Sequence, residues 1–225
     1  MKILGIDTSS KFLSIAISDN DKIILEESHL LDRKHSSEMV PKIEELLKKI
    51  GISIDKIDAF IVGLGPGSFT GLRIGVSAVK GFGVAAKKPC IGVASIDAIA
   101  SGVRGPYKTI VPIIDAKRMQ VYYGIYRKKG YRVIGLSGYR VAPIEKLMDK
   151  VKTEAVFLGD GVGLYREKIK RLNKKAVFLE EEYWYPSSGN LIKLGYDRIK
   201  RRKKIGLDDL IPIYLYPKDC QVKLK

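Results

Sequence analysis

The sequence predicts an α/β protein of two related lobes, each a sheet with helices packed against it. Short apolar runs of strand length alternate with segments of helical periodicity along the whole chain. The charge changes where the turn-rich stretch 101–108 interrupts that alternation, because residues 1–103 hold 13 basic and 12 acidic residues and residues 104–225 hold 28 and 13. We therefore predict an N-terminal lobe over residues 1–104 and a basic lobe over residues 105–225, leaving open that the last segment packs back on the first lobe.

The first lobe is expected to begin with an antiparallel meander of three strands, at 2–7, at 12–17 and from Lys22 onward. A helix follows over 36–50, where apolar residues recur at helical spacing and form one strongly apolar face. A buried strand is predicted at 57–63 and a second helix at 72–86, joined by a glycine-rich turn. The run PCIGVAS then predicts one more strand.

In the second lobe, TIVPIIDA and QVYYGIYRK predict a hairpin, and YRVIGLSGYRVA extends its sheet. The run PIEKLMDKV predicts a short helix, and AVFLGDGVG predicts a strand that ends in a glycine-rich turn. A last helix is expected to begin at Ser187 or Ser188 and to continue to Gly206. The tail LDDLIPIYLYPKD is expected to be irregular or extended.

The glycine-rich segment from Gly63 to Gly83 is the most informative part of the sequence. It lacks the Lys-Ser or Lys-Thr pair of a P-loop, because Leu72 and Arg73 follow the glycine at 71. Glycines at 71, 75 and 83, with Val79, lie four residues apart and give the helix a shallow stripe. Each interior glycine costs roughly 0.5–1 kcal/mol relative to alanine, so the stripe implies a close approach. That approach is to a helix of another chain or to the chain's own fold.

The turn after the first strand is a second candidate site. Asp7, Thr8, Ser9 and Ser10 offer a carboxylate, hydroxyls and turn amides, which are the groups that bind a phosphate and its metal ion. The same residue types are ordinary turn formers, so a structural role is the alternative.

Other classes of site find little support in the sequence. His29 and His35 are six residues apart, too far to bind one metal ion from the same helical face, so no metal site is expected. No GxSxG nucleophile motif is present, and Cys90 and Cys220 are expected to be reduced. No apolar run approaches a membrane span and the N-terminus begins a strand, so we expect a soluble cytoplasmic protein without a membrane partner.

Several segments together resemble the TsaB (YeaZ) family: ILGIDTSSKFLSIAI, HSSEMVPKIEELL, GLGPGSFTGLRIGVSAVKGFG, IDAKRMQVYYGIY, GDGVG and PIYLY. They span almost the whole chain, and GPGSFTGLRIG is the most specific. This family is the smaller paralogue of the TsaD proteins within the actin-like, sugar-kinase and Hsp70-like ATPase (ASKHA) superfamily, which implies a two-lobed ASKHA fold. The late family motif has an arginine where this chain has Tyr216.

The resemblance implies a non-catalytic scaffold that dimerises with a TsaD-type catalytic subunit, and that forms a homodimer when alone. That subunit, with a TsaE-type ATPase, transfers a threonylcarbamoyl group to the adenosine next to the anticodon in tRNA. In the family, two first-lobe helices make the partner contacts. The corresponding residues here are His35, Met39, Ile43, Leu46, Leu47, Leu72, Gly75, Val76, Val79, Phe82 and Gly83.

The resemblance also implies that this chain does not catalyse. TsaD-type proteins carry a helical pair of metal-binding histidines, whereas His35 is followed by Met39. ATP-using relatives have adjacent glycines after a second-lobe aspartate, whereas Ala116, Lys117 and Arg118 follow Asp115. We expect no cofactor on this chain alone, ATP or ADP at the complex interface, and a vestigial nucleotide loop at Asp7–Ser10.

The basic second half favours a polyanion such as tRNA, and a solvated, salt-tolerant surface is the alternative. The tRNA is expected to be contacted indirectly or through Lys117, Arg118, Arg201, Arg202, Lys203 and Lys204. Two rival functions remain open for the whole chain. One is an ATP-dependent kinase or hydrolase of the same superfamily, and the other is a metal-dependent glycoprotease-like protein.

Overall fold

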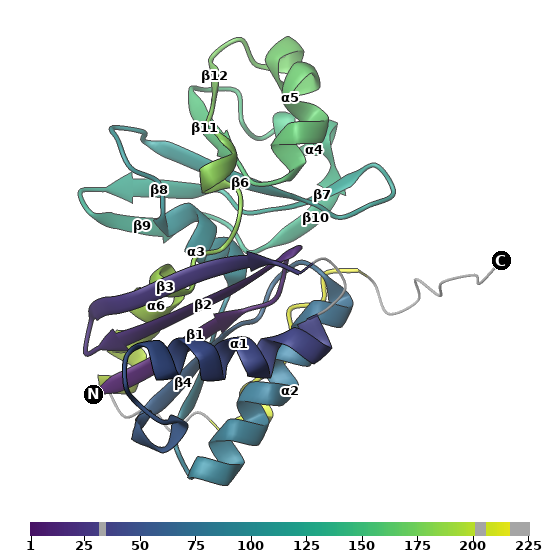
Figure 1. The fold of residues 1–225 in the computed structure, drawn as a ribbon. Coiled ribbons are helices and arrows are strands. Elements are labelled where there is room, and N and C mark those ends of the chain that lie inside the picture. The colour runs from purple at the N-terminus through teal and green to yellow at the C-terminus, as the bar shows by residue number, and fades with distance from the viewer. Residues whose placement is uncertain (32–34, 201–205, 217–225) are drawn as a thin grey trace, which may run out of the picture.

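The computed structural model describes residues 1–31, 35–200 and 206–216, which form two sheets with helices on them and between them (Figure 1). The first sheet has the order β3-β2-β1-β4-β5. Its strands β1, β2 and β3 are antiparallel, as predicted, and β1, β4 and β5 are parallel. The bounds are Lys2–Asp7 for β1, Phe12–Asp19 for β2, Lys22–Leu30 for β3, Ala59–Gly63 for β4 and Cys90–Val93 for β5.

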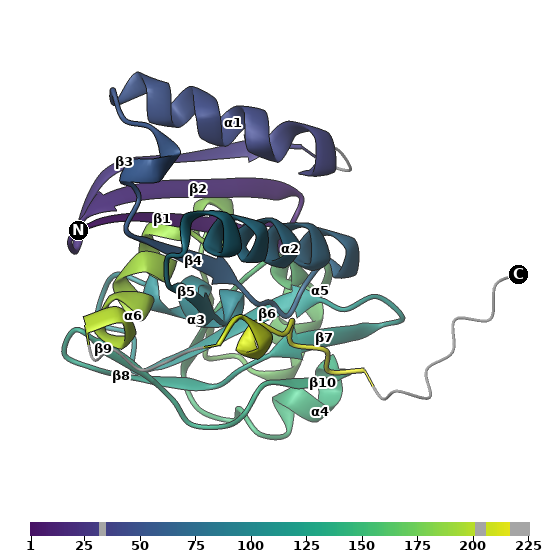
Figure 2. The same cartoon turned by 90° about the horizontal axis from the view of Figure 1, so that it is seen from below.

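Helices cover both faces of this sheet because alternate residues of β1 point to opposite sides. Leu4 and Ile6 pack with α1 (His35–Lys49) and α2 (Phe69–Ala86), which contact each other on one face (Figure 2). Ile3 packs on the other face with α6 (Ser188–Lys200), near α3 (Ser95–Ser101). The predicted first two helices are confirmed, and α2 begins three residues earlier than predicted because Ser68 caps it, its Oγ accepting from the Gly71 amide at 3.2 Å.

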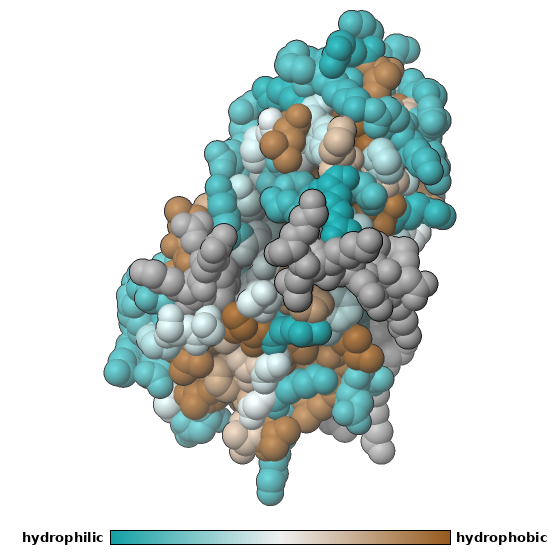
Figure 3. Space-filling view, turned by 90° about the vertical axis from the view of Figure 1, so that its right-hand side faces the viewer, coloured by the Kyte–Doolittle hydropathy of each residue, from teal (hydrophilic) through white to brown (hydrophobic). Residues whose placement is uncertain are grey.

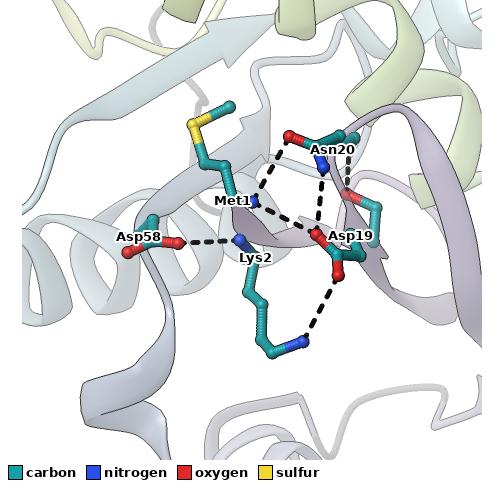
Figure 4. Close-up of polar contacts among 6 residues, drawn as sticks. Met1, Lys2, Asp19, Asn20 and Asp58 are labelled. Atoms are coloured by element: carbon teal, nitrogen blue, oxygen red, sulfur yellow. Dashed lines mark hydrogen bonds and ion pairs between the residues drawn. The ribbon is translucent and has the colours of Figure 1, made fainter.

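Polar contacts at the N-terminal corner tie three segments of the first lobe together (Figure 4). The Met1 amino group donates to Asp19 Oδ1 at 3.1 Å and to Asn20 Oδ1 at 3.3 Å. The Lys2 amide donates to Asp58 Oδ2 at 2.8 Å. The β2–β3 turn and the segment before β4, which follows a single 3₁₀ turn at Ile54–Lys56, are therefore both fixed to the start of β1.

The second sheet has the order β10-β7-β6-β11-β12, and β8 pairs with both β6 and β9. Its helices α4 (Ile144–Met148) and α5 (Gly161–Leu172) pack on one face around Phe157, and α3 lies on the other face, between the two sheets (Figure 1). The bounds are Thr109–Asp115 for β6, Gln120–Tyr123 for β7, Tyr126–Lys129 for β8, Arg132–Gly135 for β9, Arg140–Pro143 for β10, Ala155–Leu158 for β11 and Ala176–Phe178 for β12.

The helices α3 and α5 and the strand β12 were not predicted from the sequence. The glycines at 159 and 161 indicate a turn, yet Gly161 is the first residue of α5. A Cβ there would lie 3.0 Å from the Ile113 carbonyl oxygen, so the helix starts against β6 at a distance that suits glycine. The glycines therefore mark a close approach of backbone to backbone.

The C-terminal part of the described chain returns to the first lobe. Leu191, Ile192 and Tyr196 of α6 belong to the core that includes Ile3. Further along the chain, a 3₁₀ turn (Leu207–Asp209) places Leu210 in the first-lobe core with residues of α1 and α2. The backbone then crosses toward the second lobe. The last segment thus packs on the first sheet, whereas the division at residue 104 stays a prediction.

Candidate partner surface and interlobe cleft

The residues of the predicted phosphate loop come together, but their polar groups are used inside the protein. Asp7 is 1% exposed; its Oδ1 accepts from the Ser9 amide (2.8 Å) and hydroxyl (2.6 Å). Its Oδ2 accepts from the Ser95 hydroxyl at 2.5 Å, and Ser95 Oγ in turn accepts from the Gly65 amide at 3.0 Å. The carboxylate therefore ties the β1–β2 turn to α3 and to the glycine-rich loop.

The neighbouring hydroxyls complete this buried network. Thr8 is fully buried and donates to the Gly71 carbonyl at 2.7 Å, at the start of α2. Ser10 lies at the rim, where its Oγ accepts from the Phe12 amide at 3.1 Å. The structural alternative for this turn therefore accounts for its residue types, because Asp, Thr and Ser here fix a loop from within.

The glycine stripe of α2 faces the chain's own fold. A Cβ would lie 2.0 Å from the Thr8 carbonyl oxygen at Gly71, 2.3 Å from Thr8 Oγ1 at Gly75 and 2.3 Å from Cys90 Sγ at Gly83. The prediction that this stripe receives a helix of another chain is therefore wrong, and the intramolecular alternative is correct. Glycine is required because the β1–β2 turn and β5 come within contact of the helix backbone.

Most of the side chains predicted to contact a partner are also buried within this chain. Seven of them are at most 5% exposed, and all of these except Leu72 belong to the first-lobe core: Met39, Ile43, Leu46, Leu47, Leu72, Val76 and Val79. Phe82 is partly buried and its ring lies 5.6 Å from that of Phe60. His35 is the first residue of α1. An amphipathic helix buries its apolar face against its own sheet, so the opposite face of each helix is the one exposed to solvent.

That opposite face carries a second, outward stripe. Ser77, Gly81 and Ala85 are exposed and four residues apart, and a Cβ at Gly81 would meet no atom within 4 Å. We call these three residues the outer α2 stripe. Val84 of α2 is 65% exposed and Val40 of α1 is 41% exposed. Figure 3 shows apolar residues among polar ones on the side of the first lobe where α2 lies. The outer α2 stripe was not predicted from the sequence, because the spacing of four residues was followed through Gly83 and not through Gly81.

A cleft of about 1380 Å³ opens between the lobes. One wall comes from the β1–β2 turn and the start of α2, and the other from the end of β6 and the C-terminal segment. Its lining residues include Ser10, Lys11, Ser68, Phe69, Asp115, Lys117, Tyr122, Asp160, Tyr214 and Tyr216.

Two carboxylates lie on the second-lobe side of the cleft. Asp160 Oδ1 accepts from the Asp115 amide at 2.8 Å, and burial raises the pKa of Asp160. Asp115 Oδ1 accepts from the Lys117 amide at 2.8 Å, and its Oδ2 lies 2.6 Å from Lys117 Nζ. The hydrogen bond from Lys117 to Asp115 raises the pKa of Lys117. The charges of Lys117 and Asp115 therefore offset each other, and Asp160 is a second, buried carboxyl group on this wall.

The β6–β7 loop has an unusual backbone. Lys117, Arg118 and Met119 have φ values of 63°, 49° and 59°, a region that glycine occupies readily and other residues at a cost. Lys117, one of the predicted RNA contacts, lines the cleft, and Arg118, a second one, follows it in this loop. The other four, Arg201, Arg202, Lys203 and Lys204, lie outside the described residues.

Within the described ranges, no three His, Cys, Asp or Glu side chains gather as a metal site would require. None of the helices in that part of the chain has both the length and the apolar character needed to cross a bilayer.

The C-terminal segment links the two walls of the cleft. The Ile213 amide donates to the Leu64 carbonyl at 2.8 Å, and the Tyr214 ring lies 5.2 Å from that of Phe69. The Tyr216 hydroxyl, at the position where the family has arginine, donates to the Ala116 carbonyl at 2.7 Å. Tyr216 therefore fixes the segment to the second lobe.

Comparisons with known proteins agree along the whole chain. A family profile described as "TsaD: tRNA N6-adenosine threonylcarbamoyltransferase" matches residues 27–201. The "tRNA threonylcarbamoyladenosine biosynthesis protein TsaB" of Bacillus subtilis is 30% identical, covering 99% of this chain and 97% of that protein. The protein of the same name from Escherichia coli is 26% identical, with coverages of 96% and 94%.

Solved structures give the same picture. The structure of YeaZ from Pseudomonas aeruginosa has a TM-score of 0.81 at 25% identity, covering 95% of this chain and 99% of that chain. The activator of 2-hydroxyisocaproyl-CoA dehydratase from Clostridium difficile, with bound ADPNP, has a TM-score of 0.53 at 11% identity, with coverages of 92% and 98%, and shows the fold alone. The predicted two-lobed, actin-like ATPase fold is confirmed. By profile, sequence and structure, this chain belongs to the TsaB (YeaZ) family, a relative of TsaD.

Proposed function

We propose that this chain is a non-catalytic, cytoplasmic subunit in the biosynthesis of threonylcarbamoyladenosine in tRNA, and that it acts by pairing with a TsaD-type catalytic subunit. The similarity to the TsaB protein of Bacillus subtilis carries this proposal, because it extends over 99% of the chain. Both lobes and the segment that crosses the cleft are included in that match.

The surface proposed for pairing is the outer α2 stripe with the exposed side of α1. Small residues let a second helix approach closely, and the space around Gly81 is open. Exposed Val84 on α2 and Val40 on α1 add apolar side chains to the exposed faces of the two helices, as interaction surfaces do. Two copies related by a two-fold axis bring this same surface together, and a homodimer of that kind is proposed when the catalytic subunit is absent.

The non-catalytic part of the proposal is supported by the two loops of the cleft. Both Asp7 carboxylate oxygens accept hydrogen bonds from this chain's own serines. In the second lobe, the Asp115 side chain pairs with Lys117, which stands where ATP-using relatives have glycine. These loops fit a nucleotide's phosphates and metal ion poorly, so we assign no nucleotide to this chain alone and place ATP or ADP at the interface of the complex.

Reconstitution tests the function directly. Threonylcarbamoyladenosine in tRNA is measured by nucleoside mass spectrometry with the TsaD-type subunit and TsaE-type ATPase of the same organism, with and without this chain. Modification is expected only when this chain is present. Full modification in its absence would refute the proposal, and ATP turnover by the purified wild-type chain alone would favour the rival kinase or hydrolase.

A matched pair of variants tests the surface. Gly81→Arg places a long charged side chain on the outer α2 stripe, and Gly138→Arg places one in an exposed second-lobe loop where a Cβ also meets nothing within 4 Å. Gly81→Arg is expected to abolish co-purification with the TsaD-type subunit, and Gly138→Arg to preserve it. Equal binding by both variants would exclude the stripe as the contact.

A further inference from the structure

The positive charge of the second lobe is concentrated in one stretch of sequence. Between Asp115 and Glu145 there are seven Lys or Arg residues and no Asp or Glu. Four of the seven, at positions 127, 128, 129 and 132, lie on the β8–β9 hairpin. Because β8 pairs with the start of β6 and β7 pairs with its end, this hairpin and the β6–β7 loop project from opposite ends of the sheet. The hairpin is therefore separate from the cleft.

The tip of the hairpin presents an aromatic ring to solvent. Lys129 pairs with Arg132, so Gly130 and Tyr131 form a two-residue turn, with Gly130 at a φ of 58°. Tyr131 is fully exposed and, within the described ranges, takes part in no ring contact or hydrogen bond. The exposed ring, which lies between Lys129 and Arg132 in the sequence, is therefore available to a ligand.

The base of the hairpin is firmly held, whereas its charged side chains are free to bind. Lys128 Nζ donates to the Gly105 carbonyl at 2.8 Å, and the Tyr126 hydroxyl donates to Asp97 Oδ1 at 2.7 Å. Arg127, Lys129 and Arg132 are exposed and, in the described part of the chain, form no ion pair. Three unpaired cations and one free ring thus stand on a rigid arm.

We propose that the β8–β9 hairpin is an RNA-contacting arm, in which Arg127, Lys129 and Arg132 contact backbone phosphates and the Tyr131 ring stacks on an unpaired base. The inference rests on the proposed function, because tRNA is the substrate of that complex. Lys and Arg bind phosphates without reading sequence, and an exposed aromatic ring stacks on any base. A net charge of +15 on residues 104–225 attracts the polyanion to this lobe.

The first experiment separates the arm from the bulk charge. The affinity of the full-length chain for an unmodified tRNA transcript is measured by fluorescence anisotropy between 50 and 250 mM KCl. The triple variant Arg127→Glu, Lys129→Glu, Arg132→Glu is expected to bind at least about tenfold more weakly, with a salt slope smaller by roughly 2. The control, Arg171→Glu, Lys174→Glu, Lys175→Glu, makes the same charge change at exposed residues outside the hairpin and is expected to stay within about threefold. An equal loss of tRNA affinity in the two triple variants would refute the proposal that the hairpin contacts RNA.

The second experiment tests the ring. Tyr131→Ala is expected to lose on the order of tenfold in tRNA affinity with an unchanged salt slope, and Tyr131→Phe to keep the affinity, because stacking needs only the aromatic face. Both variants should melt at the wild-type temperature, since the side chain packs against nothing. Wild-type affinity in Tyr131→Ala would overturn the stacking contact.

A third measurement keeps this inference distinguishable from the proposed function. The hairpin variants should still co-purify with the TsaD-type subunit, and Gly81→Arg should lose that subunit while keeping its tRNA affinity. If the wild-type chain binds the TsaD-type subunit but no tRNA transcript, the RNA-contacting role of the hairpin is refuted and the proposed pairing stands. Binding to vesicles of anionic phospholipid in place of tRNA, lost in the triple variant, would also overturn it, because the arm would then serve a membrane surface.

Discussion

The two faces of α2 carry small residues at the same spacing and meet opposite surroundings. On the inner face, a Cβ at Gly75 would lie 2.3 Å from Thr8 Oγ1, inside the fold. On the outer face, a Cβ at Gly81 would meet nothing within 4 Å. Spacing of four therefore identifies a shallow stripe on a helix but says nothing about what approaches it. Conformational stability depends on the inner stripe, and assembly is assigned to the outer one.

The largest change in stability is expected at Asp7, which holds the β1–β2 turn against which the inner face of α2 packs. Asp7→Ala removes the acceptor of three hydrogen bonds and leaves the Ser9 and Ser95 donors unsatisfied in the interior. We expect a loss of about 4 kcal/mol in the free energy of unfolding, measured by urea denaturation, because each unsatisfied buried donor costs about 1–3 kcal/mol. Asp115→Ala, at the corresponding turn of the second lobe, is the control and should lose about 1 kcal/mol. Equal losses of stability in Asp7→Ala and Asp115→Ala would mean that the two turns contribute equally to folding.

The next effect concerns the inner stripe itself. Gly75→Ala forces a methyl group onto Thr8, which is fully buried and hydrogen-bonded to Gly71, so neither partner can move away cheaply. A loss of about 2–3 kcal/mol is expected, at the upper end of the usual cost of overpacking. The measurement is the shift of the urea midpoint at constant slope. A variant as stable as the wild type would show that the inner face is not tightly packed.

Apart from α3, the sequence predicted the elements of the first lobe well, because their strands and helices have clear apolar periods. It also predicted that glycines at 71, 75 and 83 mark a close approach. It could not identify the approaching group, since Thr8 and Cys90 reach α2 only through the pairing of β1, β4 and β5. The family resemblance assigned the face of α1 that carries Met39 and Ile43 to a partner. Apolar periodicity could not correct this, because it looks alike whether a sheet or another chain covers the helix.

The elements of the second lobe were harder to predict, because a glycine there can indicate either a turn or the close approach of a helix to a strand. Gly161 starts α5 against β6, although GDGVG is also typical of a turn. The residues of the exposed hairpin tip were not predicted as RNA contacts, because the basic residues were counted over the whole second lobe and not segment by segment. The alternation of Arg127, Lys129 and Arg132 around Tyr131 becomes visible only when the register of β8 and β9 is known.

A smaller effect is expected where the C-terminal segment covers the start of α2. The Tyr214 ring lies 5.2 Å from the Phe69 ring, and its hydroxyl accepts from Arg73 Nε at 3.3 Å. Tyr214→Ala should lower the free energy of unfolding by about 1 kcal/mol, the usual value of an aromatic pair near the surface. Tyr214→Phe keeps the ring contact and should lose less than half of that. A larger loss in Tyr214→Phe would assign the contact to the hydroxyl.

The smallest change in stability, and the sharpest test of the comparison, is expected at Gly81. Gly81→Ala adds a methyl group in open space within a helix, so it should raise the free energy of unfolding by about 0.5–1 kcal/mol. The same methyl group should weaken binding of the TsaD-type subunit several-fold, because it holds the approaching helix away from α2. Calorimetric titration and urea denaturation of one variant thus measure opposite signs for folding and for assembly. If binding tightened along with stability, the outer α2 stripe would be an ordinary solvent-exposed face and the partner would dock elsewhere.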